Sequence, residues 1–533
     1  MQTIKMSTLI DNQSPTTLVL LTLTSLYIIY HLTQTLITFH RRRIIRHKHR
    51  CKPPPSYPHT DPIFGLDIFL QNARLARDGF FMETIVSRYK NFGPSLYTFT
   101  QLFLGSRIIN TAEPENIKAV LATQFKEFEL PPRRKRAFRP TFGRGIFSTD
   151  GREWEDSRGL LRPNFARSQV GDLETFEGHV GRLVERIRLE CGGEGGIVDL
   201  QRLFFMLTMD SATEFLFGKS SDVLGLGVDH GGERERGVRF QTAFTYVTER
   251  MGVESRVGKL ATLFPDKRMD ESIKFVHEYI GGYIRKAVEL RKAGFSNEKV
   301  EKDEEGGERR KRYVFLEELA KQDISEKKIQ DELLNILLAG RDTTAGLLSY
   351  LFYVLARRKD VFAKLKAEVD ALGGERPSFE QLKSMKYLQH TLNEILRLHP
   401  IVPANSRVCV TDTTLPVGGG PDGKSPIFVK KGTQINYQVY VMHRRKDLYG
   451  EDADEFRPER WETFRPGWQY LPFNGGPRIC IGQQFALTEA AFTTVRLLQA
   501  FKGVEARDNA PFTDFLTLTA AVRGGVKVVM IPA

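Results

Sequence analysis

The stretch that most constrains this chain is residues 473–482, which read FNGGPRICIG. Gly475 and Gly476 let the backbone turn tightly and pass close to a neighbouring group, because glycine has no Cβ. Arg478 places a cation two residues before Cys480. The apolar residues after Cys480 recur at helical spacing, so a helix should begin there, and a helix N-terminus favours a thiolate. The stretch therefore predicts a cysteine thiolate on a glycine-rich loop.

A thiolate of this kind, with a cation beside it, is what a haem iron with a cysteine ligand requires. The pattern FxxGxRxCxG, filled by Phe473, Gly476, Arg478, Cys480 and Gly482, resembles the haem-binding loop of the cytochromes P-450. The resemblance implies a non-covalently bound haem b, with Cys480 as the axial ligand of the iron. It also implies that Phe473, Gly476 and Arg478 belong to the haem site. The alternative is a buried cysteine in a glycine-rich turn that binds no cofactor.

The amino-terminal region carries a separate signal. Residues 12–40 contain no Lys, Arg, Asp or Glu, and about 20 apolar residues suffice to span a bilayer as a helix. Eight Lys and Arg against one Asp give residues 1–52 a charge of +7 out of the total of +13. A cleaved signal peptide is the competing interpretation, but the basic residues follow the apolar run instead of preceding it. We therefore predict an uncleaved membrane anchor.

This anchor predicts where the protein lies and how the chain divides. Positive-inside logic puts the amino end in the lumen of the endoplasmic reticulum and the catalytic part in the cytosol, as a single-pass membrane protein. Residues 1–50 form the anchor and its basic flank, residues 51–58 a proline-rich hinge, and residues 59–533 the haem-binding domain. Because most of the positive charge lies beside the membrane, we expect lipid and not nucleic acid as its partner.

Two further motifs match the same family. Trp154 and Arg158 are four residues apart and share a face on a helix, and the resemblance implies that both contact a haem propionate. Residues 339–344 read AGRDTT within a long apolar helical pattern, where glycine and paired threonines weaken a helix locally. The resemblance places this segment over the oxygen site and implies that Asp342 and Thr343 deliver protons. The alternative is a kinked core helix without a catalytic role.

A third group of residues is expected to be structural. Glu394 and Arg397 form an ExxR pair, and the following segment contains PERW with Arg460. The resemblance implies a buried ion network of Glu394, Arg397 and Arg460 that supports the cysteine loop. It also implies that Arg407 binds a propionate.

Residues 127–147 contain Pro, Gly, Phe and Arg and read as a breaker-rich loop, which the resemblance identifies as a lid over the substrate. Its cations Arg133, Arg134, Lys135 and Arg136 are expected either to touch lipid headgroups or to bind a substrate carboxylate. The expected substrate pocket is apolar, and its candidate residues are Phe142, Phe147, Leu337, Leu338, Val402, Phe515 and Leu516.

The resemblance runs from Trp154 to Gly482 and implies a mainly α (α+β) fold, a helical domain with a small β part and haem between the central helix and the cysteine loop. The implied reaction inserts one oxygen of O₂ into a C–H bond of a small hydrophobic substrate. The sequence contains no flavin or dinucleotide-binding segment, so electrons from NADPH must come from a separate NADPH–cytochrome P-450 reductase. We expect the protein to be a monomer.

Within the superfamily, LLNILLAGRDTTAGLLS, the lid and CKPPP look most like the fungal and yeast alkane and fatty-acid hydroxylases of family 52. That likeness implies oxidation of a long aliphatic substrate at or near its end. A tailoring monooxygenase of a fungal secondary-metabolite pathway is the alternative. A haem protein that is not an oxygenase is a third reading, and the Asp342–Thr343 pair argues against it.

Overall fold

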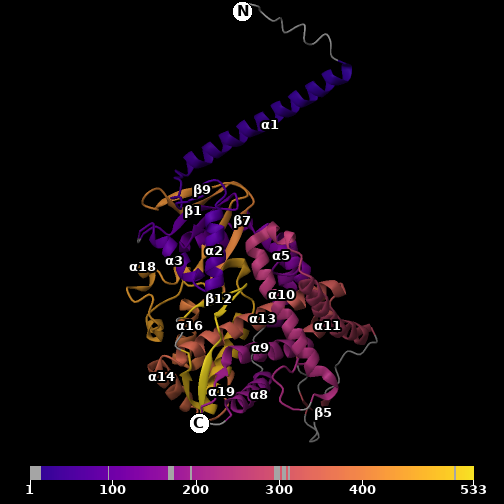
Figure 1. Cartoon of the computed structure of the whole chain (residues 1–533), viewed down its shortest axis with the longest axis vertical. Coiled ribbons are helices and arrows are strands. Elements are labelled where there is room, and N and C mark those ends of the chain that lie inside the picture. The colour runs from indigo at the N-terminus through magenta and orange to yellow at the C-terminus, as the bar shows by residue number, and fades with distance from the viewer. Residues whose placement is uncertain are drawn as a thin grey trace, which may run out of the picture.

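The central helix α13 (Glu326–Leu355) runs through the middle of the molecule, and the other helices pack around it (Figure 1). The computed structural model describes residues 14–533 except 94, 166–172, 193–194, 228, 293–300, 303–307, 310–312 and 509–511. The other α-helices are α1 (Pro15–Lys48), α2 (Leu66–Asp78), α3 (Phe81–Lys90), α4 (Pro114–Lys118), α5 (Pro132–Phe142), α6 (Gly151–Leu161), α8 (Glu174–Cys191), α9 (Leu200–Phe217), α10 (Glu233–Val257), α11 (Lys267–Lys292), α12 (Phe315–Ala320), α14 (Lys359–Asp370), α15 (Phe379–Ser384), α16 (Lys386–Leu398), α17 (Val439–Met442), α18 (Lys446–Tyr449) and α19 (Gln483–Ala500).

The strands form small sheets at the edges of the helical part. A five-stranded sheet has the order β1 (Thr98–Phe103), β2 (Ser106–Thr111), β10 (Gln434–Gln438), β7 (Ala404–Cys409) and β3 (Phe128–Glu129), with β2 and β10 parallel. A three-stranded sheet joins β11 (Phe501–Ala506), β14 (Lys527–Pro532) and β4 (Val198–Asp199). The two-stranded pairs are β8 (Thr413–Gly419) with β9 (Ser425–Val429), β12 (Asp514–Leu516) with β13 (Ala520–Val522), and β5 (Glu301–Lys302) with β6 (Glu308–Arg309). The mainly helical α+β fold is thereby confirmed.

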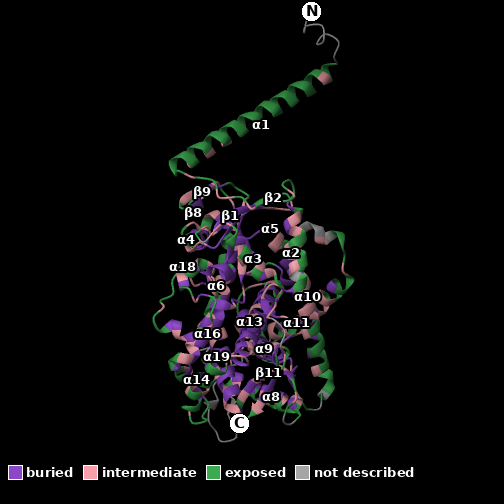
Figure 2. Ribbon diagram, turned by 60° about the vertical axis from the view of Figure 1, so that its left-hand side comes forward, coloured by how far each residue is buried: buried purple, intermediate pink, exposed green. Residues whose placement is uncertain are grey.

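Helix α13 is buried because its sequence is apolar on nearly every side. Ser325 caps its first turn by accepting a hydrogen bond from the Lys328 N–H at 3.2 Å. The helix packs against α5, α9, α11, α16 and α19, and the centre of the molecule is accordingly the buried region of Figure 2. The AGRDTT segment does not interrupt it: Thr343 Oγ1 donates to the Ala339 carbonyl at 2.6 Å, and the α-helix is continuous.

The segment expected to be a loop over the substrate contains a helix, so that expectation was wrong. Helix α5 begins after Pro131, with Pro132 in its first turn. A first-turn proline does not break a helix, because the N–H that proline lacks would have no partner within the helix there. The loop that follows is tied to α13 by buried polar side chains. Asn335 Nδ2 donates to the Phe142 carbonyl at 2.9 Å, and the Phe147 N–H donates to Asn335 Oδ1 at 3.1 Å.

The ExxR network is present and buried. Arg397 donates two hydrogen bonds to the Glu394 carboxylate, at 2.8 and 2.7 Å, and three more to backbone carbonyls of residues 443, 453 and 455. Arg460 Nε lies 3.5 Å from the same carboxylate, and the Trp461 indole donates to it at 3.0 Å. Every lone pair and donor of this buried pair is thereby satisfied, as a buried ion pair requires.

His443 connects this network to the cysteine loop. Its Nδ1 lies 3.0 Å from the Arg397 carbonyl, and its Nε2 accepts a hydrogen bond from the Leu471 N–H at 2.9 Å. These contacts assign the neutral tautomer with the proton on Nδ1. Burial lowers the pKa of His443 to about 3, so the ring stays neutral. Leu471 lies two residues before Phe473, where the loop begins.

The apolar helix expected at the amino end is α1, the one helix among the described residues that is long and apolar enough to cross a membrane. It projects from the rest of the molecule and has no buried residue (Figure 1, Figure 2). Residues 1–13 of the expected anchor lie outside the described residues. The proline-rich segment after α1 is bonded to the sheet, because the Thr100 N–H donates to the Pro55 carbonyl at 2.8 Å.

We expect His443→Gln to lose less stability than the wild type when the pH falls. A histidine whose pKa is depressed in the fold contributes stability above its unfolded pKa, near 6.5, and loses it as pH falls toward the folded value. From pH 6.5 to 5 this loss is about 2 kcal/mol for His443. The measurement is thermal unfolding of the detergent-solubilised holoprotein at pH 5 and 7. The control is His390→Gln, a half-buried histidine outside the network, and equal pH slopes in all three proteins would contradict the prediction.

Candidate active site

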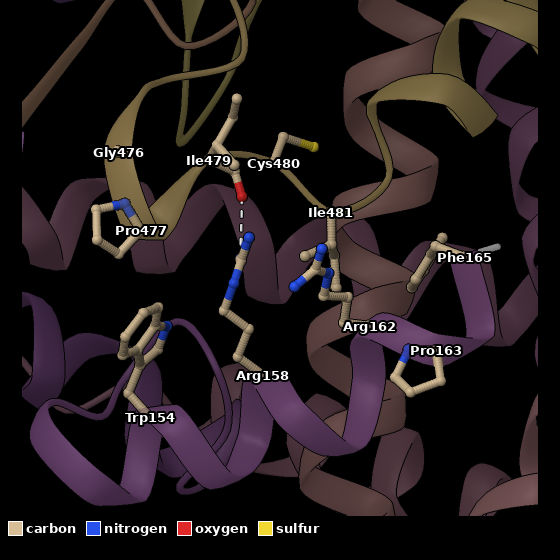
Figure 3. Close-up of a pocket in the computed structure, with 10 residues that line it drawn as sticks. All are labelled: Trp154, Arg158, Arg162, Pro163, Phe165, Gly476, Pro477, Ile479, Cys480 and Ile481. Carbon is tan, nitrogen blue, oxygen red and sulfur yellow. Dashed lines mark hydrogen bonds between the residues drawn. The ribbon is translucent and has the colours of Figure 1, made fainter. Parts of the chain in front are cut away.

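The cysteine loop is closed by backbone hydrogen bonds. The Cys480 N–H donates to the Phe473 carbonyl at 3.0 Å, and the Ile479 N–H donates to the Gly476 carbonyl at 3.0 Å. Helix α19 begins at Gln483, three residues after the cysteine, with Gly482 as its N-cap. Cys480 is exposed and lines a cavity (Figure 3). The sequence thus correctly predicted a cysteine at the start of a helix.

Position 476 requires glycine for a steric reason. Its φ is +66°, and a Cβ at this position would lie 2.0 Å from the Leu121 carbonyl oxygen. The close approach expected from the sequence is therefore to a neighbouring backbone segment of the protein. Any side chain here would push the cysteine loop away from residues 119–123, so the glycine sets the position of the loop.

The cavity beside Cys480 measures about 780 Å³ and lies between α6 and the cysteine loop. Arg158 Nη1 donates to the Ile479 carbonyl at 3.0 Å, which joins the two walls (Figure 3). The residues that line the cavity are Trp154, Arg158, Arg162, Pro163, Phe165, Gly476, Pro477, Ile479, Cys480 and Ile481. Trp154 and Arg158 share the face of α6 that the spacing predicted.

The thiol of Cys480 is not a free thiolate in the protein alone. The surrounding protein desolvates it and raises its pKa, although the Gly482 N–H and the charge of Arg158 act in the opposite direction. The favourable effect of the helix N-terminus on the thiolate is therefore outweighed by desolvation from the surrounding protein atoms, although Cys480 keeps an exposed surface on the cavity side. A metal ion held by Cys480 would supply the missing positive charge, because a coordinating thiol is deprotonated outright.

Three guanidinium groups lie close together near this cavity, those of Arg407, which is buried, and of Arg134 and Arg478, which are half-buried. Arg478 Nη2 donates to Asp150 Oδ1 at 2.7 Å and to the Thr149 carbonyl at 2.9 Å, and its guanidinium lies 4.3 Å from the Trp154 ring centroid. Arg407 donates to the Ser406 carbonyl at 2.8 Å. Arg134, which the sequence placed on the surface of the lid, donates to the Phe147 carbonyl at 3.1 Å and to Asn405 Oδ1 at 3.2 Å.

These cations destabilise one another. Burial lowers the pKa of Arg134 to about 10 and that of Arg478 to about 9, and in both cases the charge of Arg407 lowers it further. Within the described part of the chain, Asp150 is the one carboxylate that forms an ion pair with this group, through Arg478, and Asp150 is shared with Lys135 at 2.7 Å. An excess of positive charge fits an anionic ligand, and haem carries two propionate carboxylates. The residues present therefore fit a haem.

Three neighbouring positions of the central helix are only half-buried. Between residues 331 and 352, Ala339, Gly340 and Thr343 are half-buried and all the others are buried. The three share one helix face. Helix α13 also packs against α19, the helix that follows the cysteine loop.

Asp342 is placed differently from Thr343. Its carboxylate is buried and accepts a hydrogen bond from Arg341 Nη1 at 2.9 Å. Burial raises the pKa of Asp342, although Arg341 acts to lower it. Arg341 in turn donates to Thr245 Oγ1 on α10 at 2.5 Å. The two residues expected to act as a pair are thus neighbours in sequence with separate hydrogen-bond partners.

The apolar pocket candidates differ in exposure. Phe142 and Leu337 are fully buried in the core, and Leu338 is nearly so. Phe147, Val402 and Leu516 are half-buried, and Phe515 is 39% exposed beside Arg523. The lid cations also separate, since Arg133 Nη2 donates to Gln434 Oε1 at 2.6 Å and Arg136 is exposed. They do not form one carboxylate-binding cluster, because neighbouring helix positions point in different directions.

A cysteine at a helix start, a cavity beside it and cations around it define a haem-thiolate site. The chain belongs to the cytochrome P450 family, whose model matches residues 54–523. It is therefore a cytochrome P450 monooxygenase that carries a thiolate-ligated haem iron and uses O₂ and electrons from a redox partner.

The chain is similar to several fungal proteins. It is 45% identical to cytochrome P450 monooxygenase himC of Aspergillus japonicus over 90% of this chain and 83% of that protein. It is also 45% identical to cytochrome P450 52A5 of Candida maltosa, over 84% of this chain and 85% of that protein. A crystal structure of the cytochrome P450DA haem domain shares the fold, with a TM-score of 0.71 and 22% identity, covering 91% of this chain and 97% of that one.

Sequence reasoning missed three residues that the structure brings into the site or its support: Arg134, His443 and Trp461. Arg134 lies in a run of four basic residues, and spacing alone does not tell which of them faces inward. His443 is a single histidine far from any motif. Trp461 was visible as the last letter of PERW, but its indole contact with Glu394 depends on how that segment folds.

We expect Arg134→Gln to release haem about tenfold faster than the wild type. A hydrogen bond to a charged group contributes about 1.5–3 kcal/mol, and 1.4 kcal/mol corresponds to tenfold. The measurement is haem transfer from the purified protein to an excess of apomyoglobin. Arg136→Gln, an exposed residue of the same helix, is the matched control.

The haem-free protein separates a cofactor role from a folding role. Removing one of three mutually repelling cations should leave its unfolding temperature unchanged or higher. A clearly lower unfolding temperature of haem-free Arg134→Gln would instead make Arg134 a structural residue.

Proposed function

We propose that this monooxygenase hydroxylates a long aliphatic substrate, a fatty acid or an alkane, at or near its end. The observation that carries the proposal is the 45% identity to cytochromes P450 52A5 and 52A1 over more than four fifths of this chain. The apolar character of the candidate pocket residues supports it. Only Asp342 among the candidate residues near the oxygen site carries a carboxylate, and it is already paired with Arg341.

Each residue of the site then has a role. Cys480 ligates the iron, and Arg134, Arg407 and Arg478 bind the propionates together with Trp154 and Arg158. Gly476 and Phe473 hold the cysteine loop in place. Thr343, on the half-buried face of α13, positions a proton donor near the cavity, while Asp342 reaches that region only if its contact with Arg341 changes. The bound haem supplies the binding and activation of O₂.

The cellular setting is part of the proposal. Residues 1–50 anchor the protein in the endoplasmic reticulum membrane with the catalytic part in the cytosol, residues 51–58 connect the two, and residues 59–533 form the monooxygenase domain. An NADPH–cytochrome P450 reductase in the same membrane donates the electrons, and the protein acts as a monomer.

A second candidate is a tailoring monooxygenase of a fungal biosynthetic pathway. It is favoured by the equal identity, 45% over 482 residues, to monooxygenase himC of Aspergillus japonicus. Both candidates share the site described above and differ in the substrate that fills the pocket.

We expect Thr343→Ala to bind haem normally but to lose at least tenfold in product formed per NADPH, with hydrogen peroxide released instead. A tenfold loss corresponds to about 1.4 kcal/mol of barrier, which a misplaced proton donor easily accounts for. Product and peroxide are measured with reductase present. Thr343→Ser, which keeps the hydroxyl, should recover coupling, and unchanged coupling in the alanine variant would leave Thr343 as a helix residue only.

We expect affinity to rise with the chain length of the aliphatic ligand until the pocket is filled. Each buried methylene contributes about 0.8 kcal/mol, or roughly fourfold in affinity. Binding is measured by the change in haem absorption with fatty acids and alkanes of matched lengths, and products from reductase-containing microsomes identify the oxidised carbon. No turnover of any member of either series would favour the biosynthetic alternative.

A further inference from the structure

The basic end of the anchor helix is attached to the domain by side chains. Arg42 on α1 binds Asp412, which precedes β8, through two hydrogen bonds: Nε to Oδ2 at 2.8 Å and Nη2 to Oδ1 at 3.3 Å. One turn further along α1, the guanidinium of Arg46 lies 4.7 Å from the ring centroid of Phe428 on β9. Both contacts join α1 to the same hairpin, β8–β9.

The Arg42–Asp412 pair is well placed to persist. The two side chains are 24% and 20% exposed, so salt and water screen them less than a fully exposed pair. The Lys431 N–H also donates to Asp412 Oδ1 at 2.8 Å. Burial acts to raise the pKa of Asp412, but these hydrogen bonds outweigh it and leave the pKa below its ordinary value. Asp412 is therefore an oriented, ionised partner.

The segment between α1 and the domain also forms backbone hydrogen bonds, both to the end of α1 and to the β8–β9 hairpin. The Cys51 N–H donates to the Arg46 carbonyl at 2.9 Å, and the Lys52 N–H donates to the Pro426 carbonyl at 2.9 Å. The Gly420 N–H donates to the Pro53 carbonyl at 3.0 Å. The proline-rich segment thus lies along the β8–β9 hairpin, and it holds the anchor where Arg42 and Arg46 reach that hairpin.

An exposed apolar patch lies at the same end of the molecule. It consists of Ile63, Phe64, Leu66 and Leu70, which are between 45% and 70% exposed. The Gly105 N–H, in the turn between β1 and β2, donates to the Phe64 carbonyl at 2.8 Å. Strand β1 contacts both α2 and β8, and Figure 1 shows β1 in the upper part of the domain, from which α1 emerges.

We propose that the β8–β9 hairpin is a docking site for the basic end of the anchor, and that this contact fixes the tilt of the domain so that the apolar patch enters the bilayer that α1 spans. The partner of the patch is lipid, because the patch is apolar and exposed and lies in the half of the domain from which α1 emerges, a helix that is itself long and apolar enough to cross a membrane. Arg42 and Arg46 contact the domain, while Arg43, which is exposed, remains available to lipid headgroups.

The test uses the full-length holoprotein reconstituted in phosphatidylcholine bilayers. Haem reports its own orientation, since polarised absorption of oriented bilayers gives the tilt of the haem plane. The variants are Arg42→Ala and Asp412→Asn, and Arg43→Ala is the matched control because it removes the same charge one residue away. The absorption of the ferrous carbon monoxide complex verifies that each variant keeps its haem site.

We expect wild type and Arg43→Ala to share one narrow tilt, and Arg42→Ala and Asp412→Asn to share a broader or shifted one. The double variant should change no further than either single variant, as two members of one contact require. A fluorophore on Ile63→Cys should be quenched by brominated acyl chains at least twofold less once Arg42 or Asp412 is replaced. Equal behaviour of Arg42→Ala and Arg43→Ala, or no effect of Asp412→Asn, would overturn the proposal. These readouts do not depend on the substrate or on turnover.

Discussion

The buried ion pair of Glu394 and Arg397 is the interaction on which the site depends. Arg397 uses all of its hydrogen-bonding capacity on one carboxylate and three carbonyls, and through His443 the same network reaches the segment that leads into the cysteine loop. A buried pair contributes little net stability, but losing one partner typically costs about 3–5 kcal/mol. Its value here is positional, since it joins α16, the PERW segment and the entry to the loop in one arrangement.

A second constraint is electrostatic. The protein places Arg134, Arg407 and Arg478 close together with a single paired carboxylate, Asp150, among the residues that the structure describes, and it raises the pKa of the thiol that should ligate a metal. Each feature is unfavourable by itself. A haem would offset both unfavourable features. Its iron would stabilise the thiolate, and its two propionates would neutralise the guanidinium groups. The site is therefore complementary to haem in charge as well as in sequence motif.

The parts of the site that the sequence predicted are those in which the chemistry lies within one short segment. Cys480, Gly476 and the start of α19 follow from one short segment, and the shared helix face of Trp154 and Arg158 follows from their spacing, whereas their place in a haem site was implied by the resemblance. The errors arise where long-range packing decides. Residues 132–142 look like a loop because of their prolines, yet they form α5, with Pro132 in the first turn, where a helix tolerates it, and Pro140 near the carboxyl end. Arg134 and Arg136 cannot be told apart by composition, and only the fold turns one inward and leaves the other exposed.

The sequence by itself indicated the class of protein and its cofactor, through a motif that resembles a known family, and the long apolar helix near the amino end, because these signals lie in short local patterns. Tertiary structure decided which of the candidate residues meet. It separated Asp342 from Thr343 by giving each its own hydrogen-bond partner. It brought Arg42 of the anchor to Asp412, 370 residues away along the chain. Such contacts depend on the relative placement of whole elements, which the packing of the core sets and a local pattern does not encode.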